Sequence, residues 1–388
     1  MIRSLAASFL MTASMLALTG CGQTGTQLGG AGEMEPASDT IFLSEVASGF
    51  DFPWGIAFLP EGGFLVSERE GQVSYVAPGE TSGRPVSGAP KALIEGQGGY
   101  LDIALDPEFS QNRFVYLSYS KGSGSENSTA VLKARLSDDN LSFEAGEDIF
   151  IAPTKRATSA HYGGRLMFLP DSTLLVSLGD GYRYMDDAQS PENSHGTIFR
   201  INSDGSIPDD NPFADGENGL PGVYSYGHRN VQGLAYDPDS DTIYAHEHGP
   251  RGGDEVNILE PGANYGWPVI TYGVDYDGSI ISRKTEAPGM EQPIVKWVPS
   301  IAPSGMVFYT GDKYPEWTGD LLVTALAGQK IQRIDLEKGR VKGEYWLFDE
   351  EGMRFRHIAQ GPDGYLYVLV DNIDAPVLRI EREPSRAG

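Results

Sequence analysis

One short unit recurs six times along the chain, and this repetition constrains the fold more than any other feature. Each copy contains a small residue, an apolar run, a tight turn of the Asp-x-Gly or Asp-Pro kind, and a second apolar run. The copies begin at Pro53, Tyr100, Gly163, Val231, Ser304 and Arg356. Residues 41–383 of the 388-residue chain therefore divide into six units of about 57 residues each.

The apolar runs are typical of β-strands. They are short, alternate apolar with polar residues, and end at turn residues. Several copies continue into a third alternating run, at 196–201, 330–336 and 377–382. Glycine (49) and proline (25) are unusually frequent, as many tight turns require. No stretch keeps a 3.6-residue period with helix caps, so we expect helices only as brief insertions.

These units predict an all-β fold, a six-bladed β-propeller of four-stranded antiparallel sheets. A single sheet per unit cannot bury both of its faces, so the units must stack on one another, and radial closure achieves this. The alternative is a pair of β-sandwich domains, but no linker or composition break divides the chain. A propeller leaves an axial channel, and we expect a ligand site in the loops at one end of it.

The N-terminus is typical of a secreted lipoprotein. Arg3 is the only charge in residues 1–20, which are apolar from Leu5 to Leu18 and lead into the only cysteine of the chain, Cys21. Leu18-Thr19-Gly20-Cys21 resembles a bacterial lipoprotein cleavage box, after which Cys21 is acylated. The alternative is an ordinary secreted protein with a cysteine in its signal region.

We therefore expect a signal peptide at 1–20, a flexible tether at 21–40 and the propeller domain at 41–388. The mature protein is expected on the periplasmic or cell-surface side, anchored to membrane lipid through Cys21. The formal charge of −25, from 29 Lys+Arg and 54 Asp+Glu, excludes nucleic acid as a partner because little could neutralise its phosphates.

Chemically versatile residues gather where the units begin or depart from their pattern. His161 precedes the third unit, where an imidazole can project into the channel. The segment 247–255 offers carbonyl and carboxylate oxygens in a glycine-rich turn, the ligands that calcium prefers. Arg354 and Arg356 lie two apart, so in an extended strand both guanidiniums point to one side and can clamp an anion with several carboxylates.

Several motifs together carry a resemblance to a known family. They are PWGIAFLP, GQGGYLDIALDPEF, HYGGRL, GHRNVQGLAYDP, EHGPRGGDE, NYGWP, WVPSIAPSGM and RFRHIAQGPDGYLYVL. Over residues 45–383 the chain resembles the soluble pyrroloquinoline quinone (PQQ)-dependent sugar dehydrogenases, that is, the glucose and aldose sugar dehydrogenases. The resemblance implies a six-bladed propeller that uses PQQ and Ca2+ to oxidise aldose sugars at the anomeric carbon to lactones. The electrons then pass to an external acceptor.

The resemblance also implies a role for each matching residue. His161 matches the general base, and Arg229 the group that stabilises charge on the reduced quinone. The implied cofactor contacts are Gln97, Arg229, Asn230, Arg354 and Arg356. The implied calcium ligands are the main-chain oxygens of Gly249 and Pro250, with Glu247 and Asn257 as ligands of a further, structural calcium.

One position departs from the family pattern. Well-known members carry a PQQ-contacting lysine where this chain has Ala327, and Lys330 lies three residues further on. Losing one charge-assisted contact lowers affinity roughly ten- to a hundredfold. Ala160 also lacks the acidic residue of the glucose-specific enzymes. Two alternatives therefore stay open: a non-catalytic or altered-ligand propeller with weakened PQQ binding, and a calcium-dependent sugar lactonase. The DYDG segment at 275–278 is interpreted as a turn.

Overall fold

The computed structural model describes Glu33–Met34 and residues 41–383. The predicted signal peptide, Cys21 and the rest of the predicted tether lie outside the described residues. Helix is confined to α1 (Phe109–Asn112) and three 3-10 turns, η1 (Met185–Gln189), η2 (Pro315–Trp317) and η3 (Asp349–Glu351). None of the helices in this part of the chain is long and apolar enough to cross a bilayer.

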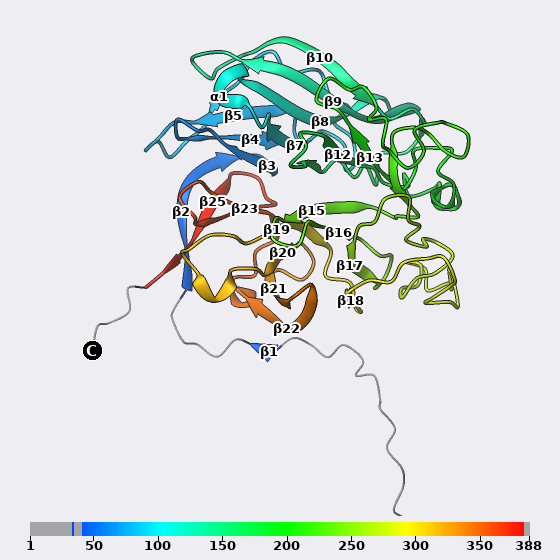
Figure 1. Ribbon diagram of the computed structural model, residues 1–388. Coiled ribbons are helices and arrows are strands. Elements are labelled where there is room, and N and C mark those ends of the chain that lie inside the picture. Colours follow the sequence, from blue (N-terminus) through cyan, green and yellow to red (C-terminus); the bar gives the residue numbers. More distant parts are fainter. Residues whose placement is uncertain (1–32, 35–40, 384–388) are drawn as a thin grey trace, which may run out of the picture. The chain divides into compact units, whose positions relative to one another are not determined.

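Six antiparallel sheets of four strands form the blades of a β-propeller, as the repeats predict (Figure 1). The first blade contains β3 (Pro53–Phe58), β4 (Phe64–Glu68), β5 (Gln72–Val76) and β6 (Arg84–Pro85). The second contains β7 (Tyr100–Leu105), β8 (Phe114–Ser123), β9 (Glu126–Leu136) and β10 (Phe143–Ile151). The third contains β11 (Leu166–Phe168), β12 (Leu174–Ser177), β13 (Thr197–Ile201) and β14 (Val223–Tyr226).

The remaining blades follow the same order. The fourth contains β15 (Val231–Asp237), β16 (Thr242–Glu247), β17 (Asp254–Ile258) and β18 (Val295–Trp297). The fifth contains β19 (Pro303–Phe308), β20 (Leu321–Ala325), β21 (Ile331–Glu337) and β22 (Arg340–Leu347), and β1 (Glu33–Met34) adds to it in parallel beside β22. The sixth contains β23 (Phe355–Gln360), β24 (Leu366–Val370), β25 (Ala375–Arg382) and β2 (Ile41–Phe50).

The first strand of each repeat is the innermost strand of its blade. The inner strands of neighbouring blades contact one another around the ring, from β3 and β7 through to β23 and β3. Serine hydroxyls in the second strands strengthen these contacts. Ser67 donates to the carbonyl of Leu101 at 2.5 Å and Ser118 donates to that of Gly164 at 2.5 Å, in each case in the next blade. A serine in the second strand of the first and second blades therefore ties each of these blades to the next.

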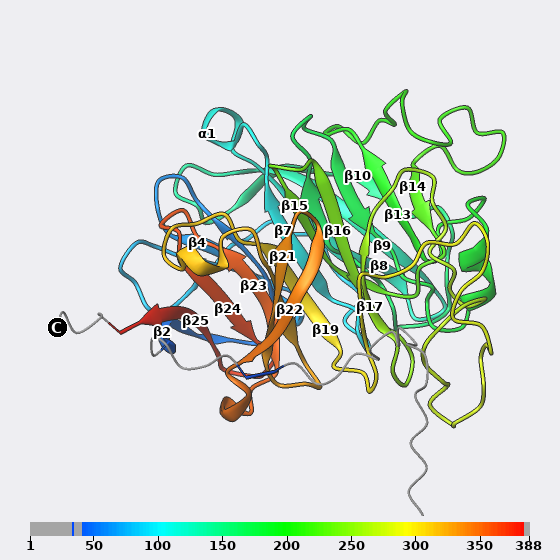
Figure 2. The same ribbon diagram turned by 60° about the horizontal axis from the view of Figure 1, so that its bottom comes forward.

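The two ends of the domain close the ring. Strand β2 pairs antiparallel with β25, from Ile41 opposite Arg382 to Phe50 opposite Ala375. Figures 1 and 2 show this blue strand beside the red one, so the N-terminal strand completes the C-terminal blade. The repeat pattern did not predict that β2 would complete the sixth blade, because its pairing partner β25 lies more than 300 residues away in the sequence.

The hydrophobic core lies between the blades. Each pair of neighbouring blades encloses one cluster of buried apolar side chains, including the pair formed by the sixth and first blades. In that closing cluster Ala47, Val66, Leu369 and Val377 are fully buried. A fully buried aliphatic side chain contributes about 1.5–3 kcal/mol, so these layers hold the ring rigid around its axis.

Candidate active site

All six blades contribute to a cavity of about 180 Å³ at one end of the channel. Its lining comes from the start of the innermost strands and from the end of the second strands, which meet at the same edge because they run antiparallel. The lining residues are Trp54, Arg69, Gln97, Leu101, Tyr162, Gly163, Asn230, Gln232, His248, Leu326, Arg354, Arg356 and Asp371. The cavity thus gathers most of the segments that the sequence analysis singled out.

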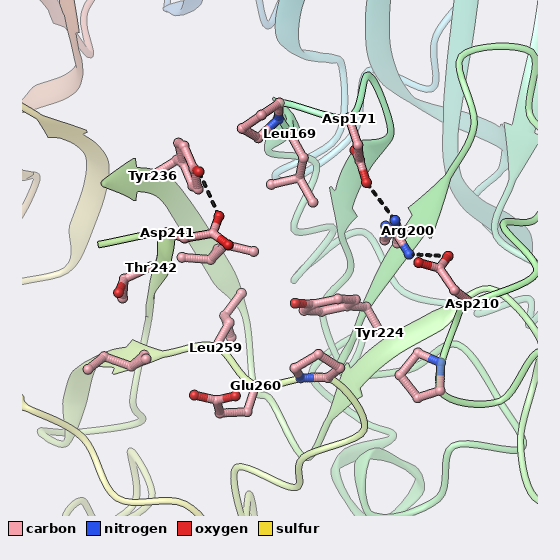
Figure 3. Close-up of a pocket in the computed structure, with 15 residues that line it drawn as sticks. Leu169, Asp171, Arg200, Asp210, Tyr224, Tyr236, Asp241, Thr242, Leu259 and Glu260 are labelled. Carbon is pink, nitrogen blue, oxygen red and sulfur yellow. Dashed lines mark hydrogen bonds and ion pairs between the residues drawn. The ribbon is translucent and has the colours of Figure 1, made fainter. Parts of the chain in front are cut away.

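A larger cavity, of about 500 Å³, lies at the other end of β11 (Figure 3). It includes the turn between β11 and β12, and its only arginine, Arg200, pairs with Asp171 at 2.6 Å and with Asp210 at 2.7 Å. The guanidinium charge is therefore already neutralised. None of the predicted site residues lines this cavity, so the smaller one is the candidate active site.

His161 is held by Asp180. The Nδ1 atom of His161 lies 2.6 Å from Oδ1 of Asp180, and both side chains are buried. The same carboxylate accepts hydrogen bonds from the Tyr182 backbone N–H at 2.7 Å and from Nε1 of Trp267 at 2.8 Å. Asp180 therefore fixes the orientation of the imidazole, and Nε2 of His161 makes no hydrogen bond to any described residue. The sequence analysis missed Asp180, although its place between Gly179 and Gly181 after β12 was a usable signal.

The backbone at His161 is also constrained. His161 has a φ of 53°, a region that costs energy for a non-glycine residue. Its N–H donates to Oε1 of Gln97 at 2.7 Å, and its carbonyl accepts from Nη1 of Arg156 at 2.8 Å. A Cβ at Gly179 would lie 2.1 Å from that carbonyl oxygen, so only glycine fits there. The neighbouring chain thus holds the imidazole in one strained position.

The electrostatic environment keeps this histidine neutral. Burial lowers the pKa of His161, the bond to Asp180 partly offsets this effect, and nearby Arg229 lowers the pKa further. Burial alone would raise the pKa of Asp180, but the contacts with His161 and Arg229 hold it below the usual carboxyl value. Near neutral pH the pair is therefore an unprotonated imidazole beside an ionised carboxylate, which suits a general base.

Arg229 and Asn230 lie beside His161 at the start of β15. Glu247 accepts a hydrogen bond from the Arg229 backbone N–H at 2.5 Å, and its other oxygen bonds Nδ1 of His228 at 2.8 Å. The Arg229 guanidinium donates to the Gly249 carbonyl at 2.6 Å. Glu247, predicted as a calcium ligand, thus also positions the arginine.

Two tyrosines flank this part of the site. The Tyr182 ring lies edge-on to His161 at a centroid distance of 5.3 Å, and it lies 6.4 Å from the Tyr276 ring. Both tyrosines are exposed, at 47% and 56%. The Tyr276 hydroxyl approaches Nη2 of Arg229 at 3.5 Å. The DYDG segment, interpreted as a turn, therefore carries an aromatic ring of the site that sequence reasoning missed.

Three arginines share one buried carboxylate in the cavity. Arg354 donates through Nε and Nη2 to Oδ2 of Asp371 at 3.2 and 3.0 Å, and Nη2 of Arg356 lies 3.4 Å from Oδ1. Nη1 of Arg69 lies 3.9 Å from the same oxygen. Burial alone would raise the pKa of Asp371, but the charge of Arg356, the hydrogen bond and charge of Arg354, and the charge of Arg69 hold it below the usual carboxyl value. One negative charge against three positive charges leaves an excess of two, which an anionic ligand would balance.

Ala327, which stands where the family has its lysine, lies outside the cluster of Asp371 and its three arginines. Ala327 is exposed and does not line the cavity, whereas its neighbour Leu326 does. Lys330 points elsewhere, since its Nζ lies 4.1 Å from the centroid of the Trp346 ring. Lys330 therefore does not replace the missing lysine.

The turn that follows β16 is built around a buried aspartate. Asp254 accepts hydrogen bonds from the N–H of Gly249 at 2.8 Å, of Ile301 at 2.7 Å and of Ala302 at 2.9 Å, and from the hydroxyl of Ser300 at 2.7 Å. This network fixes the turn that contains Gly249 and Pro250, whose main-chain oxygens were predicted to bind calcium. Neither residue lines the 180 Å³ cavity, and the Gly249 carbonyl accepts the hydrogen bond from Arg229.

Two carboxylates oppose each other next to this turn. Glu247 on β16 is directly opposite Glu255 on β17, and Asn257 lies on the same face. Burial and then the neighbouring Glu247 raise the pKa of Glu255, and the Oδ1 atom of Asn257 is buried without a hydrogen bond. A cation bound here would relieve the repulsion between like charges and satisfy that oxygen, so the residues fit calcium. Glu255 ends the segment 247–255, whose carboxylates were expected to suit calcium, but the sequence analysis did not name it individually as a ligand.

No group of three or more His, Cys, Asp or Glu side chains within the described ranges could hold a metal ion by itself. A calcium ion at this end of the channel would therefore depend partly on main-chain and amide oxygens.

Comparisons with known proteins agree with this geometry. A profile of the glucose/sorbosone dehydrogenase family matches residues 50–379. The aldose sugar dehydrogenase YliI of Escherichia coli K12 is 38% identical over 348 residues, which cover 89% of this chain and 94% of that protein. The crystal structure of the soluble aldose sugar dehydrogenase of Escherichia coli in its apo form superposes with a TM-score of 0.85 at 38% identity, over 88% of this chain and 99% of that one.

A PQQ-bound structure is also similar. It is the aldose sugar dehydrogenase of Streptomyces coelicolor, with a TM-score of 0.76 and 28% identity, over 90% of this chain and 99% of the other. The family match, the six blades and the similarity to these solved structures lead to one conclusion. The chain belongs to the glucose/sorbosone dehydrogenase family, the PQQ-type sugar dehydrogenases.

Proposed function

We propose that this protein oxidises aldose sugars at the anomeric carbon to lactones, with PQQ and calcium as cofactors and an external electron acceptor. The observation that carries the proposal is the pairing of a neutral histidine, held by Asp180, with a nearby cavity that has two excess positive charges. A base beside an anion-binding cavity suits proton removal from a substrate next to an anionic redox cofactor.

In this proposal His161 accepts the proton of the anomeric hydroxyl at Nε2. That nitrogen is available because Nδ1 is engaged by Asp180. The buried carboxylate then stabilises the imidazolium that forms, which lowers the barrier to proton transfer. When bound in the cavity, PQQ would supply the hydride acceptor and calcium would supply Lewis acidity.

The other residues of the site bind and orient the cofactor. Arg354 and Arg356 bind carboxylates of the cofactor, while Gln97 and Asn230 offer amide groups at the wall of the cavity. Asn230 itself is fixed, because its Oδ1 accepts from the Gly163 N–H at 3.1 Å. The Arg229 guanidinium lies 5.3 Å from the Trp267 ring and 5.9 Å from the Tyr276 ring, and it supplies positive charge where negative charge develops.

The two exposed tyrosines supply the surface for the substrate. A sugar whose anomeric hydroxyl meets Nε2 of His161 lies within reach of Tyr182, whose ring is 5.3 Å from the imidazole. The C–H face of a pyranose packs well on an aromatic ring. We assign Tyr182 to this contact.

Neither alternative explains the site as well. A lactonase would require several carboxylates that converge on one axial metal, whereas the cavity is lined by arginines, amides and a single aspartate. A propeller with weakened PQQ binding is favoured by Ala327 alone. We propose in addition that the mature chain is anchored to lipid through Cys21 on the periplasmic or cell-surface side.

The test is a titration of the purified protein with PQQ in the presence of calcium, followed by addition of aldoses and a redox dye. We expect saturable binding and sugar-dependent dye reduction. His161→Ala should abolish dye reduction but keep PQQ binding, whereas His195→Gln, at a buried histidine outside the cavity, should keep both. The proposal would be refuted if the protein did not bind PQQ at tens of micromolar, a concentration far above the dissociation constant expected for a cofactor.

A further inference from the structure

We propose that Arg69, in the first blade, is the third cation for the carboxylates of the cofactor and takes over the role of the lysine that Ala327 replaces. This inference rests on the proposed function, since it concerns how the same cavity holds PQQ. The question arises because PQQ is a tricarboxylate, whereas the sequence analysis identified only two arginines for its carboxylates.

Arg69 is fixed at the wall of the cavity. It directly follows β4, and its backbone N–H donates to the Phe52 carbonyl at 3.0 Å. The guanidinium lies over the Phe52 ring, 4.3 Å from its centroid. A Cβ at Gly99 would lie 1.8 Å from the Arg69 carbonyl oxygen, so the neighbouring loop packs directly on this backbone. The side chain is therefore presented to the cavity from a rigid support.

The guanidinium donors of Arg69 are free within the described part of the chain. Its guanidinium makes no hydrogen bond to any described residue, and its two ion-pair contacts are long, 3.8 Å to Glu70 and 3.9 Å to Asp371. Arg354, in contrast, donates twice to Asp371. Arg69 thus keeps its planar fork of N–H groups free for a ligand carboxylate.

The charge balance points the same way. Asp371 is the only acidic residue that lines the cavity, and it is already closest to Arg354 and Arg356. The nearest carboxylates to the Arg69 guanidinium among the described residues are those of Glu70 and Asp371, both at the long distances given above, and the Arg69 side chain is 21% exposed. A carboxylate of the ligand would give it a close partner in partly desolvated surroundings, where such a bond is strong.

Among the described residues, no cation of the fifth blade lines the cavity. Ala327 carries no charge, and Lys330 is engaged with Trp346. Ala327 does not itself line the cavity, but its neighbour Leu326 does, so a lysine side chain at position 327 would begin at the rim of the cavity that Arg69 lines. A channel lined by all six blades allows a cation of one blade to replace that of another, because residues far apart in sequence approach the same ligand.

The experiment measures the dissociation constant of PQQ for the apo-protein in calcium, from the absorbance of the cofactor. We expect Arg69→Gln to raise it roughly ten- to a hundredfold, and Arg69→Lys to have a smaller effect because the charge remains. The matched control is Arg84→Gln, at an exposed arginine of the same blade that lies over the Tyr75 ring and whose only ion pair among the described residues is with Glu80; it should leave the dissociation constant of PQQ unchanged. Melting temperatures without PQQ check that each variant is folded.

A rescue experiment tests the exchange itself. In Arg69→Gln/Ala327→Lys the lysine of the family pattern returns, and we expect PQQ affinity to recover at least tenfold relative to Arg69→Gln. If Arg69→Gln binds PQQ within twofold of the unmodified protein, the inference is wrong while the proposed function stands. Failure of the double variant to recover affinity would overturn the equivalence of the two positions. If the unmodified protein does not bind PQQ, the cofactor assignment and this inference both fall.

Discussion

The substitution Asp180→Asn tests the centre of the proposed mechanism. Asp180 accepts three hydrogen bonds, from His161, the Tyr182 N–H and Nε1 of Trp267. Asparagine has one carbonyl oxygen and one NH2 group, so at least one buried donor would then face another donor. The lost charge-assisted bond and the unsatisfied donor together cost about 2–4 kcal/mol of stability.

The effect on catalysis follows from the same contacts. The variant loses the carboxylate that orients the imidazole and stabilises its protonated form. General base catalysis contributes about 10²–10⁴ in rate, so we expect kcat to fall by about 100-fold or more. The bond to Asp180 also raises the pKa of His161 against the effect of burial. Its loss should therefore move the acidic limb of the kcat profile to lower pH.

The assay is dye reduction by the PQQ-loaded protein at saturating sugar, measured against pH. In the unmodified protein the rate should hold as pH falls through about 6.5, the usual imidazole value, since burial lowers the pKa of His161. A kcat within threefold of the unmodified value, or an acidic limb that moves to higher pH, would show that Asp180 does not support the base. PQQ affinity serves as the internal control, because Asp180 does not line the cavity.

Three further outcomes follow from the geometry. In metal-free protein, burial and the neighbouring Glu247 raise the pKa of Glu255 to about 8. The free energy of unfolding should therefore fall as pH rises from about 4.5 towards 8, because the unfolded chain ionises this carboxyl first. Calcium binds the ionised carboxylate and should raise the melting temperature more at the alkaline end of this interval. Asp254→Ala removes four hydrogen bonds at a fully buried site and should cost about 3–5 kcal/mol in chemical denaturation, with weaker calcium binding. Tyr182→Ala should raise the KM for sugar roughly three- to tenfold with little change in kcat, whereas Tyr182→Phe keeps the ring and should behave like the unmodified protein; equal kinetics for all three would exclude a stacking role.

Much of the architecture was predictable because it is encoded locally. Alternating apolar runs and turn residues define strands over five to ten residues, and six similar copies can bury their faces only by stacking in a ring. The copies beginning at Pro53, Tyr100 and Val231 coincide with the first residue of an innermost strand. The loops at one end of these strands meet, so His161, Gln97, Asn230, Arg354 and Arg356 could be assigned to one region through their motifs.

Contacts between distant segments were not predictable in this way. The pairing of β2 with β25 joins residues more than 300 positions apart, and no local pattern records which strand completes the last blade. Asp180 lies 19 residues after His161 on another segment of the third blade, and only the register of β12 brings the two together. The glycines on either side of Asp180 set it apart in the sequence, but a short polar residue after a strand is common, so this context does not reveal that its partner is His161.

The sequence by itself determined the repeats, the strand content and the residue types available to the channel, because propensity and periodicity act over a few neighbouring residues. Only the tertiary structure decided how these residues combine. It showed that Asp371 joins arginines from the first and sixth blades, and that Glu247 holds Arg229 as well as opposing Glu255. The physical reason is that charge balance and hydrogen-bond partnership are properties of positions in space, and ring closure brings together groups that the chain keeps far apart.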